Sequence, residues 1–121
     1  MRRLLQQLGL AALTAALVQT AGAHAFLERA VPAVGSSVRT SPTELKLWFT
    51  ERLEPAFSKV RVEDGGGKQV DRGDGRVDAA AGVLLRVSLP PLQAGTYRVK
   101  WRVLSVDTHV SEGDFTFDVA P

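Results

Sequence analysis

Apolar and polar residues alternate along most of this chain, and a period of two is typical of β-strands with one buried face. The alternating runs are 44–50, 59–63, 84–89, 97–103 and 114–119. Turn-forming Gly, Pro, Asp and Ser residues separate them, and no long stretch has helical periodicity. About seven short strands at this spacing predict an all-β fold, an antiparallel immunoglobulin-like β-sandwich with Greek-key connections. The polar, Gly- and Ala-rich segment 70–82 is expected to be a mobile loop.

Residues 1–23 have the features of a signal peptide. Two arginines precede an apolar stretch, residues 8–18, that is shorter than the roughly 20 residues a bilayer span needs. Ala21-Gly22-Ala23 follows, and small residues at its first and last positions are what signal peptidase accepts. We therefore predict export and cleavage after Ala23. Cleavage after Ala21 or Ala25, or an uncleaved membrane anchor, are the alternatives.

The predicted mature domain, residues 24–121, is long enough for one small hydrophobic core. The chain has fifteen basic and thirteen acidic residues, and the loss of Arg2 and Arg3 makes these numbers equal. A formally neutral domain lacks the basic surplus of nucleic-acid-binding proteins, so no nucleic-acid partner is expected. The chain has no cysteine, which excludes thiolate metal sites and cysteine nucleophiles, and its single methionine is Met1.

Histidine is the most informative residue type, because the chain has only His24 and His109. Cleavage after Ala23 would make His24 the first residue, so that its α-amine and imidazole could chelate one metal ion. Asp107 precedes His109 by two positions, and side chains at that spacing share a face in an extended segment. Together these groups would supply three nitrogens and one oxygen. That set suits tetragonal Cu(II), whereas zinc accepts similar ligands but prefers a tetrahedron.

Each of these signals also has an ordinary structural explanation. An Asp-x-His pair is most often a surface pair, and spacing alone does not show that the two ends of the chain meet. The serines and threonine near His109 lack a recognisable orienting group and oxyanion site, so no enzymatic activity is predicted. The Gly-rich stretches 64–67 and 72–75 lack a phosphate-loop lysine in register and are interpreted as turns.

Several segments are similar to those of a known family. The first half carries His24-Ala25-Phe26-Leu27 and Leu47-Trp48-Phe49-Thr50-Glu51, and the second half carries Ser105-Val106-Asp107-Thr108-His109 and Gly113-Asp114-Phe115-Thr116-Phe117. With them the chain resembles the CopC family of periplasmic copper-binding proteins. The resemblance implies an immunoglobulin-like barrel or sandwich and one Cu(II) bound by His24, Asp107 and His109. It also implies that Glu51 lies near the copper as in some members, the alternative being a solvated carboxylate at a strand end.

The resemblance further implies where the protein works and what it contacts. It suggests a periplasmic protein that binds copper ion and has a CopD-type inner-membrane protein as partner. Separately, we expect the domain to be a monomer. Some family members hold Cu(I) in a methionine-rich loop. Because Cu(I) selects soft thioether ligands and the predicted mature domain has no methionine, no Cu(I) site of that kind is expected.

The predicted function is therefore that of a copper carrier, which binds one Cu(II) and buffers or delivers it in copper homeostasis or resistance. One alternative is a copper-dependent oxygenase with an N-terminal histidine brace, although Asp107 would then fill a position that oxygen needs. The other is a metal-free immunoglobulin-like interaction domain.

Overall fold

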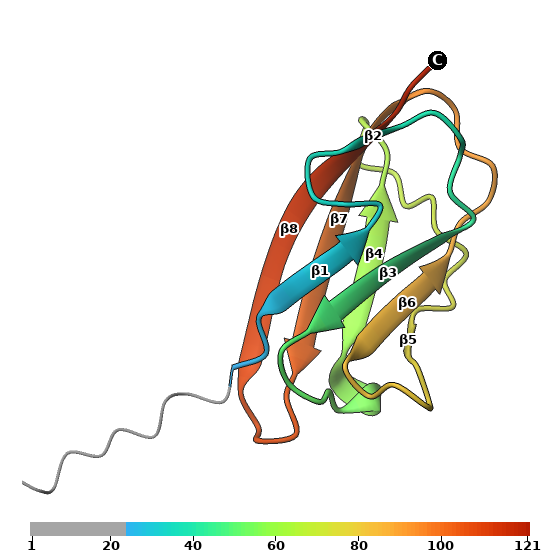
Figure 1. Ribbon diagram of the computed structural model, residues 1–121. Helices are drawn as coiled ribbons and strands as arrows, with labels where there is room; N and C mark the ends of the chain where they lie inside the picture. Colours follow the sequence, from blue (N-terminus) through green and yellow to red (C-terminus); the bar gives the residue numbers. More distant parts are fainter. Residues whose placement is uncertain (1–23) are drawn as a thin grey trace, which may run out of the picture.

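Two four-stranded sheets pack against each other as a sandwich (Figure 1). The computed structural model describes residues 24–121; the predicted signal peptide, residues 1–23, and its cleavage after Ala23 lie outside the described residues. The first sheet has the order β1-β3-β6-β5 and the second β2-β8-β7-β4. The elements are β1 (Leu27–Val31), β2 (Ser37–Val38), β3 (Glu44–Phe49), the 3-10 helix η2 (Pro55–Phe57), β4 (Lys59–Glu63), β5 (Arg76–Val77), β6 (Leu84–Ser88), β7 (Gly95–Leu104) and β8 (Val110–Val119). The predicted all-β sandwich is confirmed.

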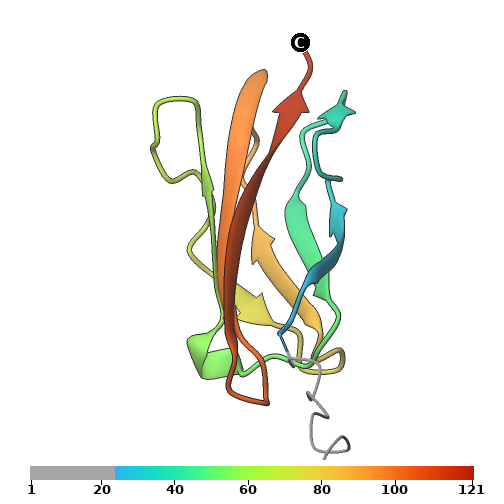
Figure 2. The same ribbon diagram turned by 90° about the vertical axis from the view of Figure 1, so that its left-hand side faces the viewer.

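The alternating runs of the sequence became β3, β4, β6, β7 and β8. Strand pairing is antiparallel throughout both sheets except between β2 and β8, which are parallel. The longest pairing is the β7–β8 hairpin, which runs from the Gly95–Val119 pair to the Leu104–Val110 pair. This hairpin spans the length of the sandwich, so its turn lies at one end of the molecule (Figure 2). In the part of the chain that the structure describes, no helix is long and apolar enough to cross a membrane.

The core consists of the inward-facing residues of both sheets. Members with almost no exposed surface include Leu45, Leu47 and Phe49 of β3, Leu85 and Val87 of β6, Val99 and Val103 of β7, and Phe117 of β8. Phe49 also meets Trp101 of the opposite sheet edge to face, with ring centroids 5.1 Å apart. Aromatic pairs in this geometry add to the stabilisation from buried area.

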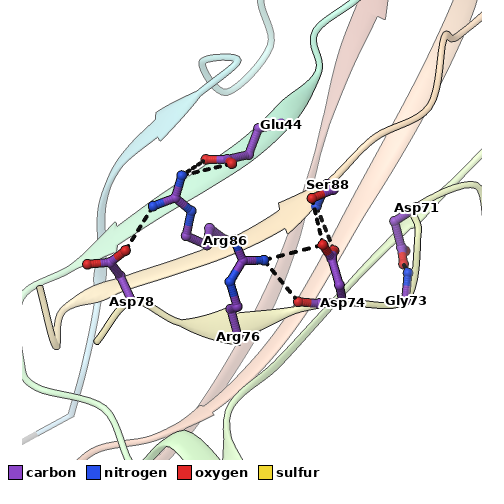
Figure 3. Close-up of polar contacts among 8 residues, drawn as sticks. All are labelled: Glu44, Asp71, Gly73, Asp74, Arg76, Asp78, Arg86 and Ser88. Atoms are coloured by element: carbon purple, nitrogen blue, oxygen red, sulfur yellow. Dashed lines mark hydrogen bonds and ion pairs between the residues drawn. The ribbon is translucent and has the colours of Figure 1, made fainter. Parts of the chain in front are cut away.

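Charged side chains cover the outer face of the first sheet and hold residues 70–82 in place (Figure 3). Arg86 of β6 forms ion pairs with Glu44 at 2.6 Å and with Asp78 at 2.8 Å. Asp74 accepts hydrogen bonds from both the hydroxyl and the amide of Ser88. The segment expected to be a loop therefore contains β5, which pairs with β6, and its aspartates fasten it to the sheet.

A second acidic group lies on the outer face of the other sheet. The Glu63 carboxylate forms ion pairs with Arg61 at 2.7 Å and Lys100 at 3.1 Å. The pKa of Glu63 lies below its ordinary value of 4.5, chiefly because Arg61 donates a hydrogen bond to it and, to a lesser extent, because Lys100 does. The Asp74 pKa is held below 3.8 chiefly by the Ser88 hydroxyl, and the Asp78 pKa chiefly by Arg86.

These lowered pKa values predict that the fold loses stability in acid. A carboxyl group whose pKa is lower in the folded state stabilises the fold above its unfolded pKa, and this contribution is lost as pH falls through the folded pKa. The urea midpoint should therefore fall progressively below about pH 4.5. Asp78→Asn should lower the midpoint at pH 7 and flatten this dependence. Glu28→Gln is the control, because exposed Glu28 forms no ion pair with residues 24–121; an equal response of both variants would contradict the assignment.

Candidate metal centre

One end of the sandwich brings together three segments that are far apart in the sequence. The start of the described chain at His24, the β7–β8 turn, and the connection from β3 to η2 all lie at this end (Figures 1 and 2). They carry all the residues that the sequence singled out as metal ligands or neighbours: His24, Glu51, Asp107 and His109.

His24 and His109 lie side by side, although 85 positions separate them in the sequence. Their ring centroids are 4.8 Å apart and their planes are inclined by 56°. When two imidazoles bind one ion with a nitrogen–metal–nitrogen angle of about 90° and metal–nitrogen bonds of about 2 Å, their ring centroids are roughly 4 to 5 Å apart. Both histidines are exposed, so an ion between them could be exchanged with solvent or a partner. The side chain of Phe26, which is 62% exposed, lies beside this pair, with its ring centroid 6.3 Å from that of His24.

The residues next to His24 fasten the start of the chain to the sandwich. Ala25 is fully buried and belongs to the hydrophobic core. The Phe26 amide donates to the Thr50 hydroxyl at 2.9 Å, and the Thr50 amide donates to the Phe26 carbonyl at 2.9 Å. Leu27 then enters β1 opposite Phe49. These contacts place the His24 backbone beside the β7–β8 turn.

Ser105 organises the turn that carries His109. Ser105 is fully buried, and its amide donates to the His109 carbonyl at 3.0 Å. Its hydroxyl accepts from the His109 amide at 3.3 Å, and its carbonyl accepts from the Thr108 amide at 2.8 Å. Thr108 has a φ of 71°, a left-handed conformation that a β-branched residue adopts only under strong constraint. Ser105, one of the serines near His109, is thus part of the scaffold of this turn.

The structure does not bring Asp107 and Glu51 into a cluster with the two histidines. Within residues 24–121 no group of three or more His, Asp or Glu side chains is close enough to hold a metal ion. Residues 105–109 form a tight turn instead of an extended segment, so strand alternation does not set the relative directions of Asp107 and His109. Asp107 is exposed in this turn, and Glu51 is half-buried just after Thr50. The assignment of His24, Asp107 and His109 as ligands, and of Glu51 as a neighbour, stays a prediction.

Sequence reasoning missed the residues that position the histidines. Ala25, Thr50 and Ser105 carry no metal-binding chemistry, and their role depends on contacts between distant segments. Ser105 does belong to the Ser-x-Asp-x-His motif, which was the available signal for it. Ala25 and Thr50 also lie within the segments quoted for the family resemblance.

Comparisons with known proteins agree with the fold and with the family resemblance. The family model described as the CopC domain matches residues 27–120, which include Asp107 and His109 and begin after His24. The chain is 37% identical over 107 residues to "Copper resistance protein C" of Escherichia coli, and the match covers 83% of this chain and 84% of that protein.

Two crystal structures have the same architecture. The structure of CopC from Methylosinus trichosporium OB3b superposes with a TM-score of 0.72 and 39% identity, covering 81% of this chain and 95% of that one. The structure of PcoC, described as a methionine-rich copper resistance protein from Escherichia coli, superposes with a TM-score of 0.70 and 33% identity, covering 80% and 99%.

Proposed function

Because this chain belongs to the CopC family, to which copper resistance proteins belong, we propose that it binds one Cu(II) ion and carries or delivers it. The ligands in this proposal are the imidazoles of His24 and His109, the α-amine of His24 and the carboxylate of Asp107. The observation that carries the proposal is the separation of 4.8 Å between the two histidine rings, which belong to distant parts of the sequence.

The ligand chemistry favours Cu(II) over other divalent ions. Three nitrogen donors and one carboxylate oxygen suit a tetragonal ion, and copper(II) has the highest affinity in the series for such donors. The negative charge of Asp107 would partly neutralise the ion. Glu51, close behind the anchoring Thr50, would act on the site through its charge or through a hydrogen bond to a ligand.

The absence of thioether ligands separates this chain from a methionine-rich relative. The only methionine of the sequence is Met1, which the proposed cleavage removes. Soft thioether sulfur is what Cu(I) selects, so the proposal includes no methionine site for Cu(I).

The proposed setting is the periplasm. The signal peptide, residues 1–23, would direct export, and cleavage after Ala23 would leave the domain 24–121 with a free amine on His24. We propose that this domain acts as a monomer without catalytic turnover and exchanges copper with a CopD-type inner-membrane protein. Both histidines are exposed, which would allow direct transfer of the ion to such a partner.

Titration of the mature protein with Cu(II) tests the proposal. Visible absorption and electron paramagnetic resonance should show one nitrogen-rich Cu(II) centre per chain. Replacing a ligand should cost more than the 10–100-fold typical of outer-shell changes, so His109→Ala should weaken binding by about 100-fold or more. Asp107→Ala removes one donor and its charge, so it too should weaken binding by about 100-fold or more.

Asp114→Ala is the matched control, because Asp114 is an exposed aspartate of β8 that pairs with Arg98. It should bind Cu(II) like the unmodified protein. The proposal fails if no stoichiometric nitrogen-rich centre forms, or if His109→Ala binds as tightly as Asp114→Ala. Oxygen-dependent turnover of a polysaccharide would support the oxygenase instead.

A further inference from the structure

The outer face of the second sheet places like charges opposite each other. The β4–β7 register pairs Lys59 with Arg102 and Arg61 with Lys100. Like charges directly across a strand pair are destabilising, so this face carries a cost in folding stability. The second pair is compensated, because Glu63 forms ion pairs with Arg61 and Lys100.

The pair formed by Lys59 and Arg102 has much weaker compensation. Arg102 meets Glu112 at 3.3 Å, but both side chains are about two-thirds exposed, and exposed pairs contribute little. Lys59 is exposed and forms no ion pair with any residue from 24 to 121. Lys59 and Arg102 therefore give the end of this face nearest η2 a positive charge that the carboxylates of residues 24–121 neutralise only weakly.

An apolar hollow adjoins this pair. It has a volume of about 350 Å³, and Phe57, Val103, Leu104 and Val110 line it together with Lys59 and Arg102. Phe57 is 64% exposed and Val110 is 46% exposed, although both are large apolar side chains. Lys59 and Arg102 also line a second hollow of about 390 Å³, together with Arg61, Lys100 and the carboxylate of Glu112; the two hollows that share Lys59 and Arg102 are here called the basic groove. Each volume lies within the roughly 300–1,000 Å³ range of ligand pockets.

We propose that the basic groove binds an acidic segment of a protein partner, with an apolar side chain in the hollow beside Phe57 and carboxylates over Lys59 and Arg102. Charge complementarity selects an acidic occupant, and it would remove the repulsion that the free protein carries. The apolar hollow beside Phe57 fits a single side chain of a protein segment better than a flat lipid surface. Val110 follows His109, so a partner bound here would lie next to the candidate copper site. The inference does not depend on copper, because neither histidine lines the groove.

A capped peptide of alternating Glu and Leu residues is the probe, and the same peptide with Gln for Glu is its control. Titrated into copper-free, ¹⁵N-labelled mature protein, the Glu peptide should shift the amide signals of β4, of β7 and of Val110. Lys59→Glu removes an attraction and adds a repulsion, so it should weaken binding by about tenfold. The same change should raise the urea midpoint, because it converts a repulsive pair with Arg102 into an attractive one.

Three further arms make the result decisive. Arg39→Glu changes the charge equally but lies after β2, at the opposite end of the sandwich, and should bind like the unmodified protein (Figure 1). Phe57→Ala should weaken binding through the hollow, and His109→Ala should leave peptide binding unchanged while abolishing tight copper binding. The proposal is overturned if the shifts lie elsewhere, if Arg39→Glu and Lys59→Glu act equally, or if anionic vesicles bind this face and the peptide does not.

Discussion

One extra residue in front of His24 should weaken Cu(II) binding by on the order of 100-fold or more. The extension turns the α-amine into an amide, so the five-atom path between amine and imidazole no longer chelates the ion. The imidazole of His24 would remain beside His109, since Ala25 and the Phe26–Thr50 hydrogen bonds hold the segment independently of the terminus. The measurement is competitive Cu(II) titration of the native and extended forms.

Two controls give this comparison its meaning. The native and extended forms should have the same urea midpoint in the absence of copper, because the terminus contributes little to the core. With copper, the native form should gain more stability by linkage than the extended form, because it binds the ion more tightly. Equal affinity of the two forms would show that the amine is not a ligand. The position of cleavage would then not matter for copper binding.

Local alternation was enough to predict the sandwich, but it missed features that depend on contacts between strands. β8 begins at Val110, whereas alternation indicated a start at Asp114. Glycine weakens strand propensity, and Gly113 stands just before the alternating run. In the structure Gly113 faces Trp101, and a Cβ atom there would lie 2.6 Å from the Trp101 ring. Glycine is required by the tryptophan on the next strand, which local sequence does not reveal.

Polar composition misled the prediction for residues 70–82 in the same way. Asp74 and Asp78 looked like loop residues, yet each has a partner on β6, in Ser88 and Arg86. At the candidate site, the sequence supplied the two histidines but not their proximity. Proximity depends on Ala25, Thr50 and Ser105, whose contacts join segments from the start, middle and end of the chain. The family resemblance anticipated a meeting that spacing alone did not.

Truncating Phe49 should have the largest effect on the fold itself. Phe49 is 1% exposed and packs against Trp101, so Phe49→Ala leaves a cavity between the sheets. Buried Phe→Ala changes cost about 3–5 kcal/mol, a large part of the 5–15 kcal/mol total typical of a domain. The thermal midpoint should fall by at least about 10 °C, because 1 kcal/mol is worth roughly 4–8 °C at this size. Urea and thermal unfolding measure the change.

Phe57→Ala is the matched control, because it removes the same side chain from a site that is 64% exposed. Its free energy of unfolding should change by no more than about 0.5 kcal/mol. The comparison also separates fold from interaction, since Phe57 lines the basic groove, whereas Phe49 pairs with Leu27, three positions after His24 in the sequence. Phe49→Ala should therefore loosen the N-terminal segment and weaken copper binding, whereas Phe57→Ala should weaken only the acidic peptide. Similar unfolding costs for the two variants would mean that the hydrophobic core does not depend on Phe49.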